Sequence, residues 1–203
     1  MAEEDGAKDR RARLFVAVEL PASVRDVIGQ AIREMQERGV TAVRWVRAEG
    51  VHLTLKFLGE TPESRLEAIV RAMALAAAGA PPFELHVQGA GAFPNMRSPR
   101  VVWLGLHGQV DVLQGLQAGL EEALAGEGFP KEERAFTPHL TLGRIDGKLS
   151  PPQLHGLAES VEEFGSRSFP AFPVDGVSLV ESLLERTGAR YVQRNGVPLG
   201  QRG

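Results

Sequence analysis

The sequence predicts an α+β protein in which helices pack outside antiparallel or mixed sheets. Several predicted strands follow one another without the crossover helix that a parallel sheet requires. Amphipathic helices separate the other strands, and no segment rich in Ser, Gly or Pro divides the 203 residues into independent domains. A chain of this length forms one domain, or one domain built from two similar lobes.

Apolar residues alternate or form short runs in the predicted strands, and they recur every three or four residues in the predicted helices. Strands are expected at residues 14–20, 43–46, 51–58, 83–87, 100–106, 138–145, 172–184 and 190–194. Helices are expected at residues 23–38, 62–78, 110–125 and 151–163. Residues 89–99 are expected to form a loop. Residues 1–12 are charged and lack apolar periodicity, so we expect a disordered lead-in before a single domain at residues 13–203.

The composition excludes several classes of protein. With 43% hydrophobic and 24% charged residues, the chain can bury a core and is neither disordered, collagen-like nor a repeat array. The formal net charge is −3, whereas proteins that hold long duplex nucleic acid by bulk charge are normally basic. The net charge does not exclude a local basic pocket.

The sequence contains no cysteine, which excludes disulfides, thiolate metal sites and cysteine nucleophiles. No stretch approaches the ~20 consecutive apolar residues that span a bilayer. The first residues, Met1-Ala-Glu-Glu-Asp5, are acidic and unlike a secretory signal. We therefore expect a cytoplasmic protein that does not bind membranes.

One tetrapeptide occurs twice. His52-Leu-Thr-Leu55 recurs letter for letter as His139-Leu-Thr-Leu142, a little under half a chain length later. Both copies lie in alternating segments, and alternate residues of a strand share one face. Each copy therefore presents an imidazole and a hydroxyl about 6–7 Å apart on one face.

Strict alternation assigns the neighbouring residues to the two faces. His52, Thr54 and Lys56 would share the open face of the first strand, while Val51, Leu53, Leu55 and Phe57 would point into the core. In the second strand, His139 and Thr141 would be open, and Leu140 and Leu142 would lie in the core.

Two imidazoles that titrate near neutral pH can act as general base and general acid in one displacement. The hydroxyls can donate to an oxyanion held between them, so the pattern favours hydrolysis of a phosphate ester. Two alternatives stay open. The repeat can arise by chance in exposed strands, and two histidines can bind a metal, although neither copy has the carboxylate or third histidine that zinc and iron sites usually use.

The chain resembles the 2H phosphoesterase superfamily, and within it the RNA 2′,3′-cyclic phosphodiesterases, also called 2′–5′ RNA ligases. The resemblance covers residues 13 to 199 and extends beyond the tetrapeptides. It is carried, in order, by Arg13-Leu-Phe-Val-Ala-Val-Glu-Leu-Pro21, Val43-Arg-Trp-Val46, His52-Leu-Thr-Leu-Lys-Phe-Leu-Gly-Glu60, Gly91-Ala-Phe-Pro94, Pro99-Arg-Val-Val-Trp-Leu-Gly105, Phe136-Thr-Pro-His-Leu-Thr-Leu-Gly-Arg144, Val177-Ser-Leu-Val-Glu-Ser-Leu-Leu184 and Gly188-Ala-Arg-Tyr191.

This resemblance implies two pseudo-symmetric lobes, each an antiparallel sheet with helices outside, facing one another across a central cleft. It implies metal-independent hydrolysis of RNA 2′,3′-cyclic phosphate ends to 2′-phosphomonoesters, without a cofactor. In some members the reverse reaction ligates RNA ends through a 2′–5′ bond. The substrates implied are RNA ends or nucleoside 2′,3′-cyclic phosphates, and we expect a monomer with no obligate protein partner.

By the same resemblance, His52 is the proton donor to the leaving oxygen and His139 is the acceptor that activates water. Thr54 and Thr141 would hold the non-bridging oxygens, and Arg144 matches an arginine of the family that contacts phosphate. Strict alternation, however, puts Arg144 on the core face. The strand must therefore end or bulge near Gly143, or Arg144 is structural.

Several assignments stay open. Lys56 has the parity of a site residue, but a solvated lysine explains it equally well. His86, His107 and His155 lack a threonine partner and receive no role. Four aromatic residues could stack on a nucleobase, although aromatic strand residues are more often core: Phe15, Trp45, Phe57 and Phe136. The competing functional class is a binding protein that holds a nucleotide or RNA end through the same His and Thr residues without turnover.

Overall fold

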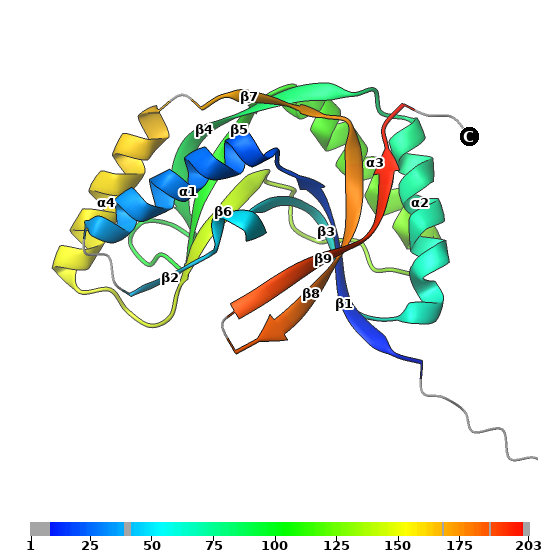
Figure 1. Ribbon diagram of the computed structural model, residues 1–203, viewed down its shortest axis with the longest axis horizontal. Helices are drawn as coiled ribbons and strands as arrows, with labels where there is room; N and C mark the ends of the chain where they lie inside the picture. Colours follow the sequence, from blue (N-terminus) through cyan, green and yellow to red (C-terminus); the bar gives the residue numbers. More distant parts are fainter. Residues whose placement is uncertain (1–8, 39–41, 168, 187, 201–203) are drawn as a thin grey trace, which may run out of the picture.

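The computed structural model describes residues 9–38, 42–167, 169–186 and 188–200 (Figure 1). The strands are β1 (Arg11–Glu19), β2 (Val43–Trp45), β3 (His52–Pro62), β4 (Phe83–Phe93), β5 (Val101–Gly108), β6 (His139–Ile145), β7 (Ala171–Val174), β8 (Gly176–Glu185) and β9 (Gly188–Pro198). The helices are α1 (Ala22–Glu37), α2 (Leu66–Ala78), α3 (Val110–Gly126) and α4 (Pro151–Ser166). Two short 3₁₀ helices are η1 (Ala48–Gly50) and η2 (Glu63–Arg65).

The strands form one curled, antiparallel, nine-stranded sheet, which confirms the α+β class (Figure 1). Its order is β7-β4-β5-β6-β3-β1-β8-β9, with β2 also paired to β6. The two predicted sheets are therefore halves of one sheet, which we call the β3 half (β3, β1, β8 and β9) and the β6 half (β6, β5, β4, β7 and β2). They join where Leu53 of β3 lies opposite Leu140 of β6. Pairing the two motif strands removes an exposed edge from each half.

The helices pack in two pairs, at opposite ends of the arch that the sheet forms (Figure 1). α2 and α3 pack together on the β3 half, while α1 and α4 lie on the β6 half. Ion pairs between Arg167 and Glu34 and between Arg38 and Glu163 join α1 to α4. Since α1 follows β1 and α3 follows β5, each half is covered by one helix that comes from a strand of the other half.

The two faces of the sheet differ, as β1 illustrates. Leu14, Val16 and Val18 are buried in the main core together with the apolar faces of the helices. Phe15 and Ala17 point to the other side, where they form a small cluster with Val180 of β8. We call this second side the open face, because the buried faces of the helices in the described part of the chain pack on the first side.

The element predictions were largely confirmed; the differences are shifted ends and one predicted strand that is divided in two. β1 begins at Arg11, inside the predicted lead-in, and residues 1–8 lie outside the described residues. β4 continues to Phe93 through part of the predicted loop. The strand predicted at residues 172–184 is two strands, which separate at Asp175.

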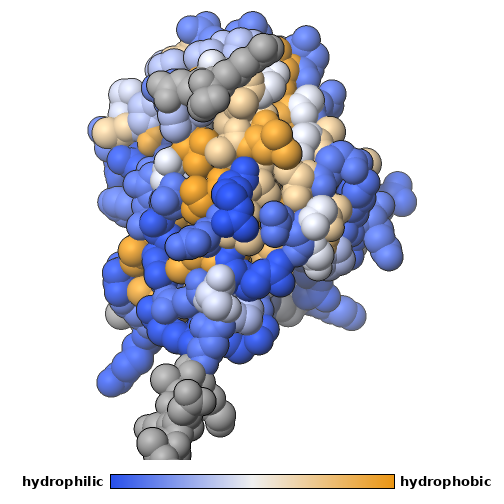
Figure 2. All heavy atoms as spheres, turned by 90° about the vertical axis from the view of Figure 1, so that its right-hand side faces the viewer, coloured by the Kyte–Doolittle hydropathy of each residue, from blue (hydrophilic) through white to orange (hydrophobic). Residues whose placement is uncertain are grey.

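On the side of α2, apolar surface gathers in a groove between α2 and α3 (Figure 2). Small residues such as Gly115 and Gly119 line the groove, and Leu75 beside them is 72% exposed. The motif residues come from β3 and β6 and do not line it. None of the helices in the described part of the chain is long and apolar enough to cross a membrane.

Candidate active site

His52 and His139 stand at the first positions of the two strands where the halves meet. Leu53 and Leu140, the residues that follow them, are fully buried in the main core, so alternation directs both histidines to the open face. Antiparallel register about the Leu53–Leu140 pair brings Thr141 across from His52 and Thr54 across from His139.

Both imidazoles are oriented by the same backbone contact. Nδ1 of His52 lies 2.8 Å from the carbonyl oxygen of Gly50, and Nδ1 of His139 lies 2.7 Å from that of Thr137. A carbonyl oxygen only accepts, so each Nδ1 carries the hydrogen. Nε2 is then the atom that takes up or gives away a proton, as an acid–base pair requires. Sequence reasoning missed this contact, because a histidine and the carbonyl two residues before it give no compositional signal.

The two histidines differ in their surroundings. Phe15 stacks on the His52 ring, with centroids 4.6 Å apart and planes at 26°, and the Tyr191 ring lies nearly perpendicular to the imidazole, with centroids 4.8 Å apart. Burial lowers the pKa of His52 below its ordinary value, and the hydrogen bond to Gly50 opposes this only in part. His52 is therefore held as a neutral imidazole near pH 7 in the free protein.

Each motif strand carries a β-bulge three residues after its histidine. Ala17 of β1 pairs with Thr54 and Val16 with Lys56, so Leu55 has no partner on β1. In the β6 half, β5 pairs with Thr141 and then with Gly143, which leaves Leu142 unpaired in the same way. A bulge shifts the alternation of side chains by one residue, so the faces predicted beyond this point are exchanged in both strands.

The bulge resolves the position of Arg144. Since alternation shifts at Leu142, Arg144 is exposed and falls on the open face with His139 and Thr141, the outcome that the sequence allowed through a bulge near Gly143. Gly143 itself is required by close packing, because a Cβ there would lie 2.5 Å from a methyl group of Val43.

The same shift makes two expectations for β3 wrong. Phe57, expected in the core, is 62% exposed on the open face, and its ring lies 6.1 Å from that of Phe15. Lys56, expected on the open face, is buried on the helix side. Its Nζ lies 2.5 Å from a carboxylate oxygen of Glu121 on α3 and donates to the carbonyl of Pro130 at 2.6 Å. Lys56 therefore does not join the histidines.

Aromatic residues also support His139. The Phe93 ring lies nearly perpendicular to the His139 ring, with centroids 5.0 Å apart, and Phe93 in turn contacts Trp103, whose backbone pairs with Thr141. A Cβ on Gly91 would lie 2.4 Å from the Trp103 ring, so only glycine leaves room for the indole. These contacts explain the Gly91-Ala-Phe-Pro94 segment that the sequence singled out.

The polar groups that remain are the two threonine hydroxyls. Within the described ranges, the hydroxyls of Thr54 and Thr141 have no hydrogen-bond partner in the protein, so both can donate to a bound anion. In the same ranges, no three His, Asp or Glu side chains cluster closely enough to hold a metal ion. The donor set at this site is two imidazoles, two hydroxyls and one guanidinium.

The three histidines without an assigned role lie away from the motifs, and the candidate stacking residues differ in exposure. His86 and His107 contact each other across β4 and β5, and His155 is on the exposed surface of α4, paired with Glu159. Trp45 and Phe136 pack against the main core, so Phe57 is the most exposed of the four candidate stacking residues. Tyr191, which contacts His52, belongs to the Gly188-Ala-Arg-Tyr191 segment of the family resemblance, and the sequence assigned it no role.

Comparison with known proteins agrees with this geometry. The chain matches the family described as LigT like Phosphoesterase over residues 18–103 and 105–191, one motif in each segment. It is 35% identical over 181 residues to a Methanothermobacter thermautotrophicus protein named RNA 2′,3′-cyclic phosphodiesterase, covering 89% of this chain and 95% of that protein. A protein of the same name from Archaeoglobus fulgidus is 36% identical over 179 residues, covering 88% of this chain and 96% of that protein.

Solved structures show the same fold. A crystal structure of a Thermus thermophilus protein superimposes with a TM-score of 0.72 at 30% identity, covering 94% of this chain and 100% of the other. Escherichia coli LigT in complex with 3′-AMP gives a TM-score of 0.72 at 28% identity, covering 95% of this chain and 100% of that one. With two motif strands meeting at the centre of one sheet and family matches across both halves, the chain belongs to the LigT-like phosphoesterase family.

Proposed function

We propose that this protein hydrolyses the 2′,3′-cyclic phosphate at an RNA end to a 2′-phosphomonoester, without a metal ion. The observation that carries the proposal is the matched pair of imidazoles on one face, each with Nδ1 bound to a backbone carbonyl. The relatives named RNA 2′,3′-cyclic phosphodiesterase support the same substrate class.

The reaction is an in-line displacement at phosphorus. A water molecule forms the new P–O bond while the bond from phosphorus to the ribose 3′ oxygen breaks. One Nε2 accepts the proton that the water loses, and the other donates a proton to the departing 3′ oxygen. Following the family resemblance, we assign the acceptor to His139 and the donor to His52. Thr54 and Thr141 donate to the non-bridging oxygens, where negative charge accumulates in the transition state.

The donor role requires a protonated His52, whereas burial lowers the pKa of this residue in the free protein. A phosphate anion between the histidines favours the imidazolium form, because a nearby opposite charge raises the pKa of histidine. We therefore propose that His52 takes up its proton together with the substrate.

This division of roles places the nucleoside on the β3 half. The 3′ oxygen belongs to the ribose, so the ribose must lie beside the donor, His52. Phe57 offers an exposed ring on the same half, next to the Phe15 ring that stacks on His52. We propose that the terminal base stacks on Phe57, while Arg144 contacts phosphate from the β6 half.

The test is incubation of the protein with a nucleoside 2′,3′-cyclic phosphate in EDTA, with separation of the 2′- and 3′-phosphate products. We expect the 2′ product, and we expect His52→Ala and His139→Ala each to lower turnover by ~10²–10⁴, with a double variant little worse. Thr54→Val and Thr141→Val should each cost ~1–3 kcal/mol of transition-state stabilisation. Tight binding without product would instead indicate the nucleotide-binding class. Activity lost in EDTA and restored by zinc or manganese would indicate metal catalysis.

A sulfur substitution separates the two histidines. In a cyclic substrate whose 3′ bridging oxygen is replaced by sulfur, the thiolate leaves without a proton, so the acid is no longer needed. If His52 is the donor, the His52→Ala variant recovers activity on the sulfur substrate and His139→Ala does not. The reverse pattern would assign the donor to His139.

The net charge of the protein limits the number of RNA phosphates that it can contact. With a net charge of −3, affinity must come from a few donors, and we propose that the protein holds the cyclic phosphate and one or two nucleotides. The salt dependence of binding should correspond to about one to three phosphate contacts, for a mononucleotide and for a long RNA alike. A slope that steepens with RNA length would reveal an extended binding track. An added 5′-hydroxyl RNA in the same assay reports whether 2′–5′ ligation also occurs.

A further inference from the structure

The His52 ring is enclosed by aromatic rings on two sides. Phe15 stacks on one face of the imidazole, and Tyr191 meets it nearly at a right angle, at 79°. Phe15 and Tyr191 also contact each other edge to face, with centroids 5.5 Å apart. The imidazole therefore cannot tilt without breaking contacts with both rings, each of which has a favourable geometry.

Tyr191 also packs on the residue that orients His52. A Cβ added to Gly50 would lie 3.1 Å from a ring carbon of Tyr191, so the phenol ring fits because Gly50 has no side chain. The carbonyl of Gly50 accepts the Nδ1 hydrogen of His52. Tyr191 thus holds both partners of this hydrogen bond.

The ring comes from the far part of the β8–β9 hairpin. β8 pairs with β1 only as far as Glu181, whereas Ser182 and the residues after it pair only with β9 (Figure 1). Tyr191 lies opposite Ser182, in the part of the hairpin that extends beyond the sheet. The His52 ring is therefore supported from two sources, by Phe15 on the neighbouring strand β1 and by Tyr191 on an extension beyond the sheet.

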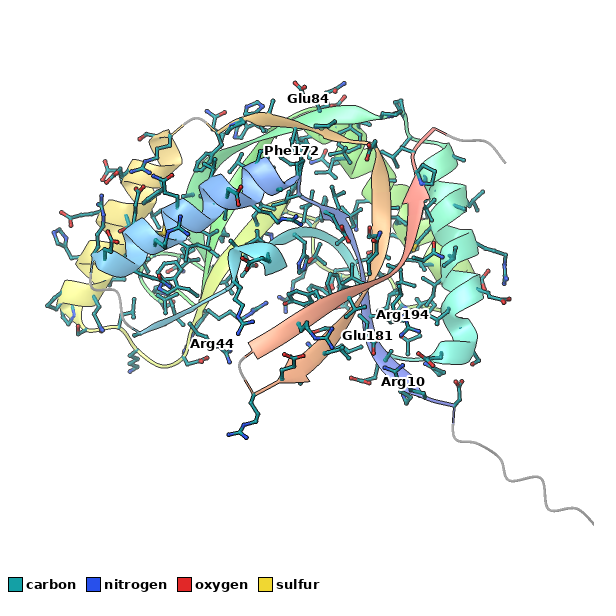
Figure 3. The ribbon with its side chains drawn as sticks, viewed as in Figure 1. Arg10, Arg44, Glu84, Phe172, Glu181 and Arg194 are labelled. Atoms are coloured by element: carbon teal, nitrogen blue, oxygen red, sulfur yellow. The ribbon has the colours of Figure 1, made fainter. Side chains whose placement is uncertain are left out.

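An ion cluster fixes the point where the hairpin leaves the sheet. The buried carboxylate of Glu181 binds Arg10 at 2.8 Å and Arg194 at 2.5 Å, and both arginines also bind Glu63 (Figure 3). Figure 3 shows Arg10, Glu181 and Arg194 together at the base of the hairpin. Because two strands and η2 meet in this cluster, the hairpin has a fixed exit direction.

The β6 half supports its histidine differently. The perpendicular ring contact on His139 comes from Phe93 on β4, which pairs with Val101 of β5 within the sheet. β4 does not extend beyond the sheet, whereas the end of the β8–β9 hairpin does. The two halves are therefore alike in backbone and motif but differ in what holds the imidazole.

We propose that Tyr191 is a positioning residue for the phosphodiesterase reaction, which holds the His52 imidazole in its working orientation and shields it from water. The inference rests on the proposed function, because orientation of His52 matters only if this residue transfers a proton. Its lowered pKa agrees with the shielding. The charged groups on β3 and on the elements around His52 are Arg11, Arg13, Glu19, Glu49, Lys56, Glu60, Arg144, Arg190 and Arg194. None of these charges causes the lowered pKa of His52. Burial lowers this pKa, and the hydrogen bond to Gly50 opposes the effect of burial.

The experiment compares Tyr191→Ala, Tyr191→Leu and Tyr191→Phe by two measurements. In the first, the ring protons of the five histidines are titrated by NMR without substrate, and the His52 signal is identified by its loss in His52→Asn. We expect the pKa of His52 to rise toward 6.5 in the alanine variant, because its ring becomes hydrated, and to stay lowered in the phenylalanine variant. The leucine variant keeps apolar bulk and should fall between the two.

In the second measurement, kcat and KM are determined on a nucleoside 2′,3′-cyclic phosphate. We expect Tyr191→Ala to lower kcat by roughly 10-fold or more with KM changed less than about 2-fold, since a misplaced catalytic group costs rate rather than binding. Tyr191→Phe should retain kcat. The matched control is Leu184→Ala, which removes a 79% exposed side chain from the same hairpin. It should change neither measurement.

An unchanged His52 titration or an unchanged kcat in Tyr191→Ala would overturn the proposal. Equal losses in Tyr191→Phe and Tyr191→Ala would show that the hydroxyl acts directly, which also contradicts a positioning role. The NMR titration needs no turnover, so it decides the shielding by Tyr191 even if the protein fails to hydrolyse the cyclic phosphate.

Discussion

Phe57 and Arg144 occupy equivalent positions in the two halves of the sheet. Each follows its motif histidine by five residues, and each reaches the open face because the strand bulges at Leu55 or Leu142. One position carries an aromatic ring and the other a guanidinium. The bulges thus turn a symmetric pair of strands into a surface with an apolar end and a cationic end, which suits a nucleotide better than a symmetric anion.

Replacing Phe57 with alanine should weaken binding of the terminal nucleoside. Base stacking on an aromatic ring contributes ~1–3 kcal/mol by alanine substitution, so KM for nucleoside cyclic phosphates should rise by about 5- to 150-fold. Steady-state kinetics on the matched pair of a nucleoside cyclic phosphate and an abasic ribose cyclic phosphate checks this. Only KM for the nucleoside cyclic phosphate should rise. A similar rise in KM for the abasic compound would show that Phe57 supports the site rather than the base. Leu75→Ala, at another exposed apolar residue, on α2, serves as the control.

Arg144 should contribute to activity by contacting the phosphate of the substrate. Arg144→Ala is expected to lower kcat/KM by about 10- to 100-fold and to reduce the salt slope of binding by about one contact. Arg144→Lys keeps the positive charge, so it should show smaller losses in both quantities. Arg44, whose backbone pairs with Arg144 and which lies near Asp146, provides the matched comparison at a neighbouring exposed arginine. Activity and salt dependence that match the wild type in Arg144→Ala would remove this residue from the site.

The lowered pKa of His52 predicts how folding stability depends on pH. The unfolded chain binds a proton at this residue near pH 6.5, while the folded protein resists it, so the unfolded state holds more protons below that pH. The free energy of unfolding should therefore decrease as the pH falls from about 6.5 toward the folded pKa, and above 6.5 His52 should contribute no pH dependence. Urea unfolding at pH 7.5 and pH 5 of the wild type and of His52→Asn, which lacks this group, checks the prediction. Identical pH dependence in the two proteins would contradict it.

Lys56 should matter for stability rather than for substrate. Removing one partner of a buried ion pair typically costs 3–5 kcal/mol because a buried charge is left unpaired, so Lys56→Met should destabilise the fold by about that amount. The double variant Lys56→Met/Glu121→Leu should recover much of the loss, since both buried charges are then gone. Urea unfolding measures both. If instead Lys56→Met folds as stably as the wild type but no longer binds substrate, the lysine belongs to the site after all.

The sequence could single out two His and two Thr residues as a candidate site, because these residue types and their spacing are local features. The face on which a residue lies depends on strict alternation, which fails at a bulge. Gly143 signalled the bulge in β6, so the position of Arg144 could be anticipated. In β3 the corresponding residue is Lys56, which gives no such signal, and the faces of Lys56 and Phe57 were wrongly predicted for that reason.

Other features depend on tertiary structure. A loop was expected at residues 89–99, yet β4 continues to Phe93, and Gly91 within it makes room for the Trp103 ring. The contact between Tyr191 and His52 joins residues far apart in the chain through a hairpin whose direction no local pattern specifies. The joining of the two halves into one sheet depends likewise on a single pair, Leu53 and Leu140.

The exchange of α1 and α3 between the halves makes the two motifs parts of one folding unit. A polypeptide containing only the first motif, from β1 to α2, would lack α3, which covers β3 through the Lys56–Glu121 pair, and its α1 would have no α4 to bind. Such a fragment would expose apolar surface on its sheet and on its helix, so it should not fold as a stable monomer. Co-expressed halves cut between β5 and α3 or between β4 and β5 should therefore reassemble, while either half alone should aggregate.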